Sequence, residues 1–420
     1  MKISRQWALL AATTLSISGA LLPITSHASA TYVYRQTLAI PGATADHRFT
    51  GYDLATFDSS NQLYYLTDRS NNGIDVFSAA TNLFVERIGA GLFSGATPSN
   101  DNAGPNGISL SNIPGGRLLI AGNGPSNLIT FTLDSTGLNV VGAPRTALTA
   151  VAGTPVPQNR VDGVAYSPTA NTILAANNAS DPGYVTLINN ASGAVIRSIL
   201  LNGTNGYPNV GGNGVEATIF NASRGSFFVA VPAFNVAGTG AGGVIELDAT
   251  TGALLHTYDF NALGLSGVCS PTGLVQGGSA SMFVACSDPT AGHSIILNPT
   301  GSGSLTLVNG ISGGDQTAYD PTTNMYFEAA RFQIGGPVLG IIDAQTLALQ
   351  TFAIGANDHS VAVDPVSGEV FVATAATTAF ANCTNGCIGV FALRVPEPGV
   401  LPLVGFGMVA VALTRKRRRH

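Results

Sequence analysis

Lysine is almost missing from this chain. It occurs only at Lys2 and Lys416, so residues 31–395, called the body below, carry none. The body has 11 Arg against 22 Asp and Glu, which gives a net charge of 11 − 22 = −11. Surfaces that bind nucleic acid or anionic lipid need clustered cations. The composition therefore argues against both partners and leaves cations and neutral sugars as easier ligands.

Tryptophan, helical periodicity and familiar catalytic motifs are also lacking. The single Trp is Trp7, so the body has none of the indole platforms on which sugars often stack. No stretch of the body keeps a helical period with charged flanks for three turns. No G-x-S-x-G, H-E-x-x-H or P-loop motif occurs. What is present is 51 Gly, and Val, Ile, Leu and Phe that alternate with Thr, Ser and Asn. This pattern is typical of strands joined by tight turns and predicts an all-β fold.

The N-terminus has the three parts of a secretory signal. Lys2 and Arg5 precede the apolar segment Trp7–Leu22, and Ala28, Ser29 and Ala30 supply the small residues of a cleavage site. This order predicts a signal peptide over residues 1–30 and an extracytoplasmic location for the body. A buried N-terminal helix is the alternative.

The C-terminal segment, residues 396–420, also has three parts. Pro396, Glu397 and Pro398 precede an apolar run, Val400–Leu413, and a basic cluster, Arg415–Arg419. The run is a short candidate for a transmembrane helix, and the basic cluster would hold that end in the cytoplasm. The body would then touch the membrane only through its tail.

Proline, glutamate and proline, an apolar run and a final arginine cluster in this order resemble the PEP-CTERM sorting tail. The resemblance implies recognition by a sorting protease of the exosortase type. It also implies release or attachment at the cell surface of a Gram-negative bacterium. A plain C-terminal membrane anchor is the alternative.

Four cysteines fit an oxidising compartment. Cys383 and Cys387 flank a turn, whereas Cys269 precedes one strand of a repeat and Cys286 ends the next. Antiparallel pairing of those strands would bring Cys269 and Cys286 together. Among three possible connectivities, the sequence predicts the disulfides Cys269–Cys286 and Cys383–Cys387. A zinc site is the alternative, without C-x-x-C spacing or a suitably placed His.

One unit of the sequence recurs seven times. It has a short strand, a turn such as Asp320-Pro-Thr-Thr-Asn324, and a second strand, and most copies continue with a third and a fourth. The first residues of the copies are Asp53, Asn106, Asp162, Glu216, Thr272, Asp315 and His359. Four antiparallel strands at a period of roughly 40–55 residues are typical of β-propeller blades. The body is therefore predicted to form a single seven-bladed β-propeller. Six or eight blades, a β-helix and a two-domain sandwich are the alternatives.

The ends of the body predict how the ring closes. The seventh copy has three strands, the last over Cys387–Leu393, and lacks a fourth. The segment Tyr32–Ile40 has the pattern of a fourth strand. It is therefore predicted to complete the seventh blade, because closing the ring removes the free edges.

The first residue of each copy precedes its innermost strand, so these seven side chains should surround one mouth of the central channel. Carboxylates gathered there repel one another unless a cation or protons intervene. Their oxygens suit Ca²⁺ or another divalent cation. The predicted metal ligands are Asp53, Asn106, Asp162, Glu216 and Asp315, with Thr272 and His359 completing the mouth. Capping of turns and binding of channel water is the alternative.

Two of these segments resemble the senescence-marker/gluconolactonase family of propellers, namely Pro105-Asn106-Gly107-Ile108 and Val161-Asp162-Gly163-Val164. The resemblance implies one divalent metal held by Asn106, Asp162 and Glu216. Glu216 departs from the family pattern because Ala-Thr follows it instead of Gly-Pro, and that family has six blades. The copies also resemble YVTN and other lactonase-like surface propellers.

Two functions remain open at this point. The first is a monomeric, surface-sorted binding protein for an extracellular polysaccharide or surface protein, without chemistry. The second is a metal-dependent hydrolase of a small lactone or ester. The first is preferred, and enzymatic activity stays uncertain.

Overall fold

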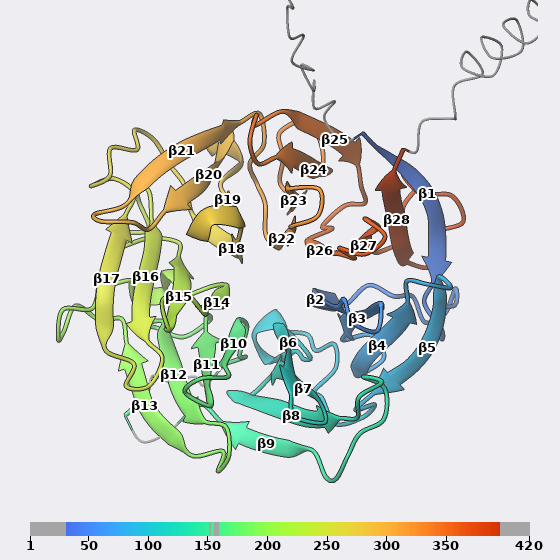
Figure 1. Ribbon diagram of the computed structural model, residues 1–420, viewed down its shortest axis with the longest axis horizontal. Helices are drawn as coiled ribbons and strands as arrows, with labels where there is room; N and C mark the ends of the chain where they lie inside the picture. Colours follow the sequence, from blue (N-terminus) through green and yellow to red (C-terminus); the bar gives the residue numbers. More distant parts are fainter. Residues whose placement is uncertain (1–30, 151–152, 155–158, 395–420) are drawn as a thin grey trace, which may run out of the picture.

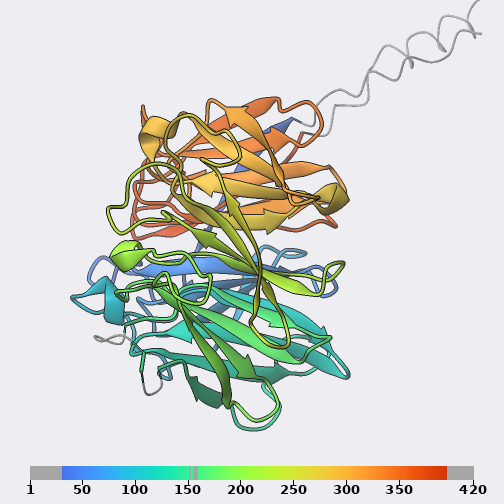
Figure 2. The same cartoon turned by 90° about the vertical axis from the view of Figure 1, so that its left-hand side faces the viewer.

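The computed structural model describes residues 31–150, 153–154 and 159–394. The predicted signal peptide and sorting tail lie outside these residues. The described chain forms seven antiparallel sheets of four strands, arranged as the blades of a ring around a central channel (Figure 1). The prediction of an all-β, seven-bladed β-propeller is therefore confirmed. Figure 2 shows the ring from the side, with connecting loops on both of its faces.

Within each blade, the strands are named from the innermost to the outermost. Blades 1 to 4 are β2 (Tyr52–Asp58), β3 (Leu63–Asp68), β4 (Gly73–Ser78) and β5 (Leu83–Ile88); β6 (Ile108–Ile113), β7 (Gly116–Asn123), β8 (Asn127–Leu133) and β9 (Arg145–Leu148); β10 (Val164–Ser167), β11 (Thr172–Asn177), β12 (Tyr184–Asn189) and β13 (Val195–Leu200); β14 (Thr218–Asn221), β15 (Ser226–Val231), β16 (Gly243–Asp248) and β17 (Leu254–Asp259). Blades 5 to 7 are β18 (Pro271–Gln276), β19 (Met282–Cys286), β20 (His293–Asn298) and β21 (Ser304–Asn309); β22 (Thr317–Asp320), β23 (Met325–Ala330), β24 (Val338–Asp343) and β25 (Leu349–Ala353); β26 (Ser360–Val363), β27 (Val370–Thr374), β28 (Cys387–Leu393) and β1 (Tyr32–Ala39).

Burial follows from the position of each strand within its blade. Second strands such as β11 and β15 are buried at every residue, because a neighbouring blade covers each of their faces. Outer strands such as β5 are exposed or half-buried at every residue except the last. The apolar core is divided into seven clusters, and each cluster lies between two neighbouring blades. A single blade would leave both of these faces in water, so blades are stable only within the ring.

The ring closes through the N-terminal strand, as predicted. β1 pairs antiparallel with β28, from Tyr32 opposite Leu393 to Ala39 opposite Cys387. Tyr32 is fully buried, and its ring meets Phe327 of blade 6 edge-on. Its backbone N–H donates to Oε1 of Gln350 and its carbonyl accepts from Nε2 of Gln350, each at 3.0 Å. The N-terminal strand therefore joins blade 7 to blade 6 as well as completing blade 7.

The strand directions place the ends of the described chain on one face. β26 begins beside His359, β27 returns toward that face, and β28 runs away from it. The described chain therefore starts and stops on the face opposite His359. There the N–H of Arg394 donates to the carbonyl of Thr31 at 2.7 Å.

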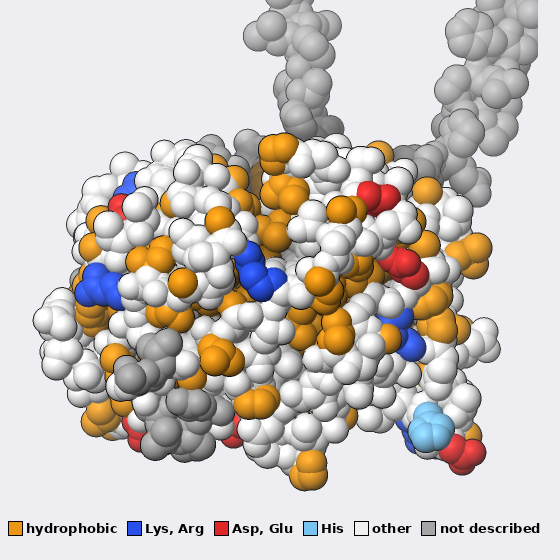
Figure 3. All heavy atoms as spheres, turned by 90° about the horizontal axis from the view of Figure 1, so that it is seen from below, with side chains coloured by type: hydrophobic (Ala, Val, Ile, Leu, Met, Phe, Trp, Pro, Cys, Tyr) orange, Lys and Arg blue, Asp and Glu red, His pale blue; other side chains and the backbone are white. Residues whose placement is uncertain are grey.

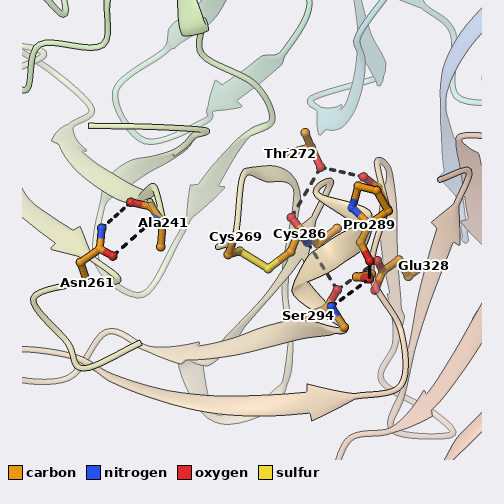
Figure 4. The surroundings of a disulfide bond; sticks show 12 residues. Ala241, Asn261, Cys269, Thr272, Cys286, Pro289, Ser294 and Glu328 are labelled. Atoms are coloured by element: carbon orange, nitrogen blue, oxygen red, sulfur yellow. Dashed lines mark hydrogen bonds between the residues drawn. A yellow bond between two sulfur atoms is a disulfide. The ribbon is translucent and has the colours of Figure 1, made fainter. Parts of the chain in front are cut away.

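Both predicted disulfides are present, Cys269–Cys286 and Cys383–Cys387, and the described chain has no free cysteine. The first ties the segment that enters blade 5 to the end of β19 (Figure 4). With all four sulfurs bonded in pairs, the zinc alternative is excluded.

The side of the ring seen in Figure 3 carries few charges, and hydrophobic side chains are scattered there among neutral polar ones. No helix in the described part of the chain is long and apolar enough to cross a membrane. The predicted transmembrane segment of the tail belongs to the residues that the structure does not describe.

Candidate binding site at the channel mouth

One end of the central channel opens into a cavity of about 810 Å³. Six of the seven predicted mouth residues line it, and they are Asp53, Asp162, Glu216, Thr272, Asp315 and His359. They come from six different blades, because each stands at or just before the start of an inner strand. The repeat pattern therefore placed these residues in one site.

Asn106 is the exception among the predicted residues. It is fully buried, and its Nδ2 donates to the carbonyls of Ala103, at 2.9 Å, and Val161, at 3.1 Å. Its Oδ1 accepts from Nε of Arg69 at 3.0 Å. The amide thus holds neighbouring segments of the wall together and is occupied by protein groups.

The glycines that follow Asn106 and Asp162 have a packing role. A Cβ added at Gly107 would lie 1.4 Å from the carbonyl oxygen of Asp162, and one at Gly163 would lie 2.5 Å from that of Glu216. At Gly273 the distance to the carbonyl oxygen of Asp315 would be 1.8 Å. Adjacent inner strands approach too closely for any side chain there. The Asn-Gly and Asp-Gly pairs that carry the family resemblance therefore have an explanation in the packing of the ring.

Three arginines pair with the three aspartates of the mouth, and the sequence reasoning missed them. Nη2 of Arg69 lies 2.5 Å from Oδ2 of Asp53, Nε of Arg160 lies 3.0 Å from Oδ1 of Asp162, and Nη2 of Arg331 lies 3.0 Å from Oδ2 of Asp315. Guanidinium groups thus provide the positive charge that the carboxylate ring requires.

A spacing in the sequence could have revealed two of these arginines. Arg69 and Arg331 each stand 16 residues after the first residue of their copy, just beyond the second strand. The third copy has Asn178 at the same spacing, and its Nδ2 donates to Oδ2 of Asp162 at 2.7 Å. The position beyond the second strand therefore faces the first residue of the same copy.

The Asp53–Arg69 pair is the least exposed of the three ion pairs. Burial alone would raise the pKa of Asp53, but Arg69 and a hydrogen bond from His359 outweigh it and hold the pKa well below its usual range. Nε2 of His359 lies 3.3 Å from Oδ1 of Asp53, and its ring stacks on Tyr52. Nη1 of Arg69 donates to Asn100 at 2.7 Å. This pair supports the wall of the mouth.

Glu216 stands between the two more accessible pairs. Burial, followed by the charges of Asp162 and Asp315, raises the pKa of Glu216 well above its usual range. The remaining three carboxylates face three guanidinium groups. The three aspartates and the three arginines of the mouth therefore carry equal and opposite formal charges.

The geometry of the mouth bears on the predicted divalent cation. Across residues 31–150, 153–154 and 159–394, no three carboxylate, imidazole or thiol side chains are grouped closely enough to hold a metal ion. Asn106 is turned into the wall, and each mouth aspartate has an arginine partner. Metal binding by Asp53, Asn106, Asp162, Glu216 and Asp315 stays a prediction.

A second ring of side chains lies just inside the mouth. It is formed by the third residue of each copy, and its members are Ala55, Ile108, Val164, Thr218, Leu274, Thr317 and Val361. Five are aliphatic and two are hydroxyl-bearing. Thr218 and Thr317 are each 8% exposed, and neither Oγ1 has a hydrogen-bond partner within the described chain. A buried polar group without a partner is unusual and indicates a water or a ligand.

The buried side chain of Glu328 lies below Thr272 and packs behind the wall of the mouth (Figure 4). Oγ1 of Thr272 donates to the carbonyl of Gly314 at 3.0 Å. Glu328 lies behind Gly314, with Oε1 accepting from Ser294 at 3.0 Å and Oε2 without a partner. Burial raises the pKa of Glu328 to about 8. Glu328 is therefore neutral under mildly acidic conditions.

Stability is expected to fall as pH rises from 5 to 8. Glu328 keeps its proton in the folded chain up to about pH 8 but loses it near its ordinary value of 4.5 when unfolded. A raised folded-state pKa contributes stability that is lost as pH climbs toward it, by roughly 1.4 kcal/mol per pH unit. Asp68 and Asp358, with pKa values raised mainly by burial to about 8 and about 7, change the stability in the same direction.

Urea unfolding at four pH values measures the effect. The free energy of unfolding of Glu328→Gln should fall less steeply with pH than that of the parent. The exposed control Asp46→Asn should keep the parent slope. Equal slopes for the parent and Glu328→Gln would contradict the assignment.

Comparisons with known proteins show the fold. No family model matches the chain, and no curated protein matches it. Among solved structures, a chain of the "Crystal Structure of Mitotic Checkpoint Complex" superposes with a TM-score of 0.58 at 11% identity, covering 92% of this chain and 99% of that one. The "Crystal structure of RRP9 WD40 repeats" gives a TM-score of 0.57 at 10% identity, covering 86% and 97%. The body is thus similar to WD40 propellers, and its kinship with lactonase-like propellers stays a prediction.

Proposed function

We propose that this chain is an exported, surface-sorted β-propeller that binds an extracellular polysaccharide or surface protein through the channel mouth, without chemistry. The observation that carries the proposal is the cavity of about 810 Å³, lined by charged and polar side chains from six blades. Its volume lies in the range of ligand-binding pockets. The fold also fits an interaction role, since one similar solved chain belongs to a multi-protein complex.

Export and sorting rest on the two terminal segments of the sequence. Residues 1–30 have the order of a signal peptide, and residues 396–420 resemble a sorting tail that a protease of the exosortase type recognises at Pro396, Glu397 and Pro398. The disulfides Cys269–Cys286 and Cys383–Cys387 support an oxidising compartment.

Processing at both ends is the expected result for protein recovered from the cell surface. Intact-mass spectrometry should find a chain that begins near Thr31 and has lost Arg415–Arg419. Replacement of Pro396, Glu397 and Pro398 by alanine should leave the basic cluster attached, because the sorting motif is destroyed. Parent protein that retains Arg415–Arg419 at the surface would contradict sorting and support a plain anchor.

A second candidate function is hydrolysis of a small lactone or ester, with a divalent cation such as Ca²⁺ at the mouth as the sequence predicts. One observation favours it. Burial and the neighbouring Asp162 raise the pKa of Glu216, and neighbouring carboxyl groups with different pKa values are a common arrangement for acid–base catalysis. Metal analysis and lactone hydrolysis before and after chelation separate the two candidates. Turnover that chelation removes and Asp162→Ala abolishes would decide for the hydrolase.

A further inference from the structure

Two ion pairs at the mouth, called the open pairs below, are more exposed than the Asp53–Arg69 pair, whose side chains are 10% and 8% exposed. The side chains of Arg160 and Asp162 are 12% and 14% exposed, and those of Arg331 and Asp315 are 25% and 18% exposed. The first pair belongs to blade 3 and the second to blade 6, with Glu216 of blade 4 and Thr272 of blade 5 between them around the ring. All of these residues line the same cavity.

Each open pair offers a hydrogen-bond donor directly beside an acceptor. A guanidinium only donates, and a carboxylate only accepts. A hydroxyl group does both, so two neighbouring hydroxyls can accept from the arginine and donate to the aspartate of one pair. Nε of Arg331 has no hydrogen-bond partner within the described chain.

The electrostatics of the mouth favour an uncharged ligand. A carboxylate or phosphate would face Asp162 and Asp315 as well as Arg160 and Arg331, and an ammonium group would meet the same mixture. The body as a whole carries −11, which further disfavours anions. A neutral molecule meets no such repulsion and can use both members of each pair.

The ring beneath the mouth suits a molecule with both hydroxyl and C–H surface. Val164, Leu274 and Val361 provide an apolar floor, and Thr218 and Thr317 interrupt it with hydroxyls that have no partner in the described chain. Rotation of either threonine about its Cα–Cβ bond toward a ligand would break no hydrogen bond. A bound hydroxyl would therefore satisfy two groups that the fold leaves unsatisfied.

We infer that the channel mouth binds a neutral saccharide of one or two rings, held by the Arg160–Asp162 and Arg331–Asp315 pairs with its ring face over the aliphatic floor. The inference rests on the proposed binding function and narrows it to a substrate class. The saccharide is either a free sugar or the end of a polysaccharide chain, because the hydroxyl chemistry is the same.

Saturation-transfer NMR on the protein as exported tests the inference. The probes are neutral mono- and disaccharides, a uronic acid and an amino sugar, all measured with chelator present. Neutral sugars should bind. Arg331→Gln should weaken binding by roughly tenfold or more, because it removes a charged donor, and Thr317→Val by roughly two- to tenfold. The control Arg35→Gln, on the exposed edge of β1, should have no effect. Thermal unfolding of each variant confirms that it is folded.

Binding of a neutral polysaccharide but not of its free repeating sugar would assign the site to chain ends. Preference for the uronic acid or the amino sugar would overturn the inference, as would neutral-sugar binding that Arg331→Gln and Thr317→Val leave unchanged. Adhesion of the protein to its own cell surface separates the two proposals. If no sugar binds but Arg331→Gln abolishes adhesion, the saccharide inference is wrong and the binding function stands. If Arg331→Gln leaves adhesion intact, the binding function of the mouth is wrong.

Discussion

A chain that lacks residues 31–40 is expected not to fold. This segment supplies the outer strand of blade 7, and Tyr32, Leu38 and Ile40 are all buried. Burial of each such side chain contributes roughly 1.5–3 kcal/mol, and a whole domain is stable by only about 5–15 kcal/mol. The deletion also leaves β28 without its partner and exposes Phe327 of blade 6. Circular dichroism with heating should show no cooperative transition for the deleted chain.

Two control variants make the deletion result specific. A chain that ends after Val395 keeps β1 and β28 and should unfold like the parent. Gln350→Ala removes only the two hydrogen bonds to Tyr32 and should cost about 1–3 kcal/mol. A cooperative transition at the parent temperature in the chain without residues 31–40 would show that the ring closes in another way.

Gly107→Ala is expected to destabilise the protein by about 4 kcal/mol or more, which few single substitutions do. The added Cβ would lie 1.4 Å from the carbonyl oxygen of Asp162, so the backbone of blade 2 or blade 3 must move. Gly107 does not have a left-handed φ, so the cost comes from lack of space. Urea unfolding measures the change.

Gly212→Ala is the matched control, because its Cβ would meet the nearest atom at 3.5 Å and its φ is not left-handed either. Gly163→Ala, with 2.5 Å to the carbonyl of Glu216, should have an intermediate effect. Equal stability of Gly107→Ala and Gly212→Ala would contradict the packing role of these glycines.

Most of the fold could be predicted because local sequence patterns determine its strands and turns. An inner strand was predicted to follow Asp162, and β10 begins at Val164; the last strand of the seventh copy was predicted at Cys387–Leu393, which is β28. Alternation, turn residues and a repeat period require no knowledge of distant contacts. Even the closure by Tyr32–Ile40 follows from the count of strands in the seventh copy.

The chemistry of the mouth was harder to predict, because it depends on how side chains meet across the ring. The sequence placed Asp162 and Asp315 at the mouth but did not reveal that Arg160 and Arg331 pair with them. The side chain of Asn106 points into the wall because its amide donates hydrogen bonds to the carbonyls of Ala103 and Val161. No local sequence pattern predicts these contacts. The spacing of 16 residues from Asp53 to Arg69 can be seen in the sequence. It indicates a contact between the two side chains only when the lengths of the intervening strands and turn are known.

The described chain both starts and stops on the face opposite the mouth, where Arg394 lies beside Thr31. A tether that continues from Arg394 would therefore leave the entrance of the channel directed at the surrounding medium. Attachment would not occlude the entrance, and a polymer too large to pass beneath the protein would still reach it. The tethered and the released forms should consequently bind the same ligand with the same affinity, and sorting would determine where binding occurs without altering its strength.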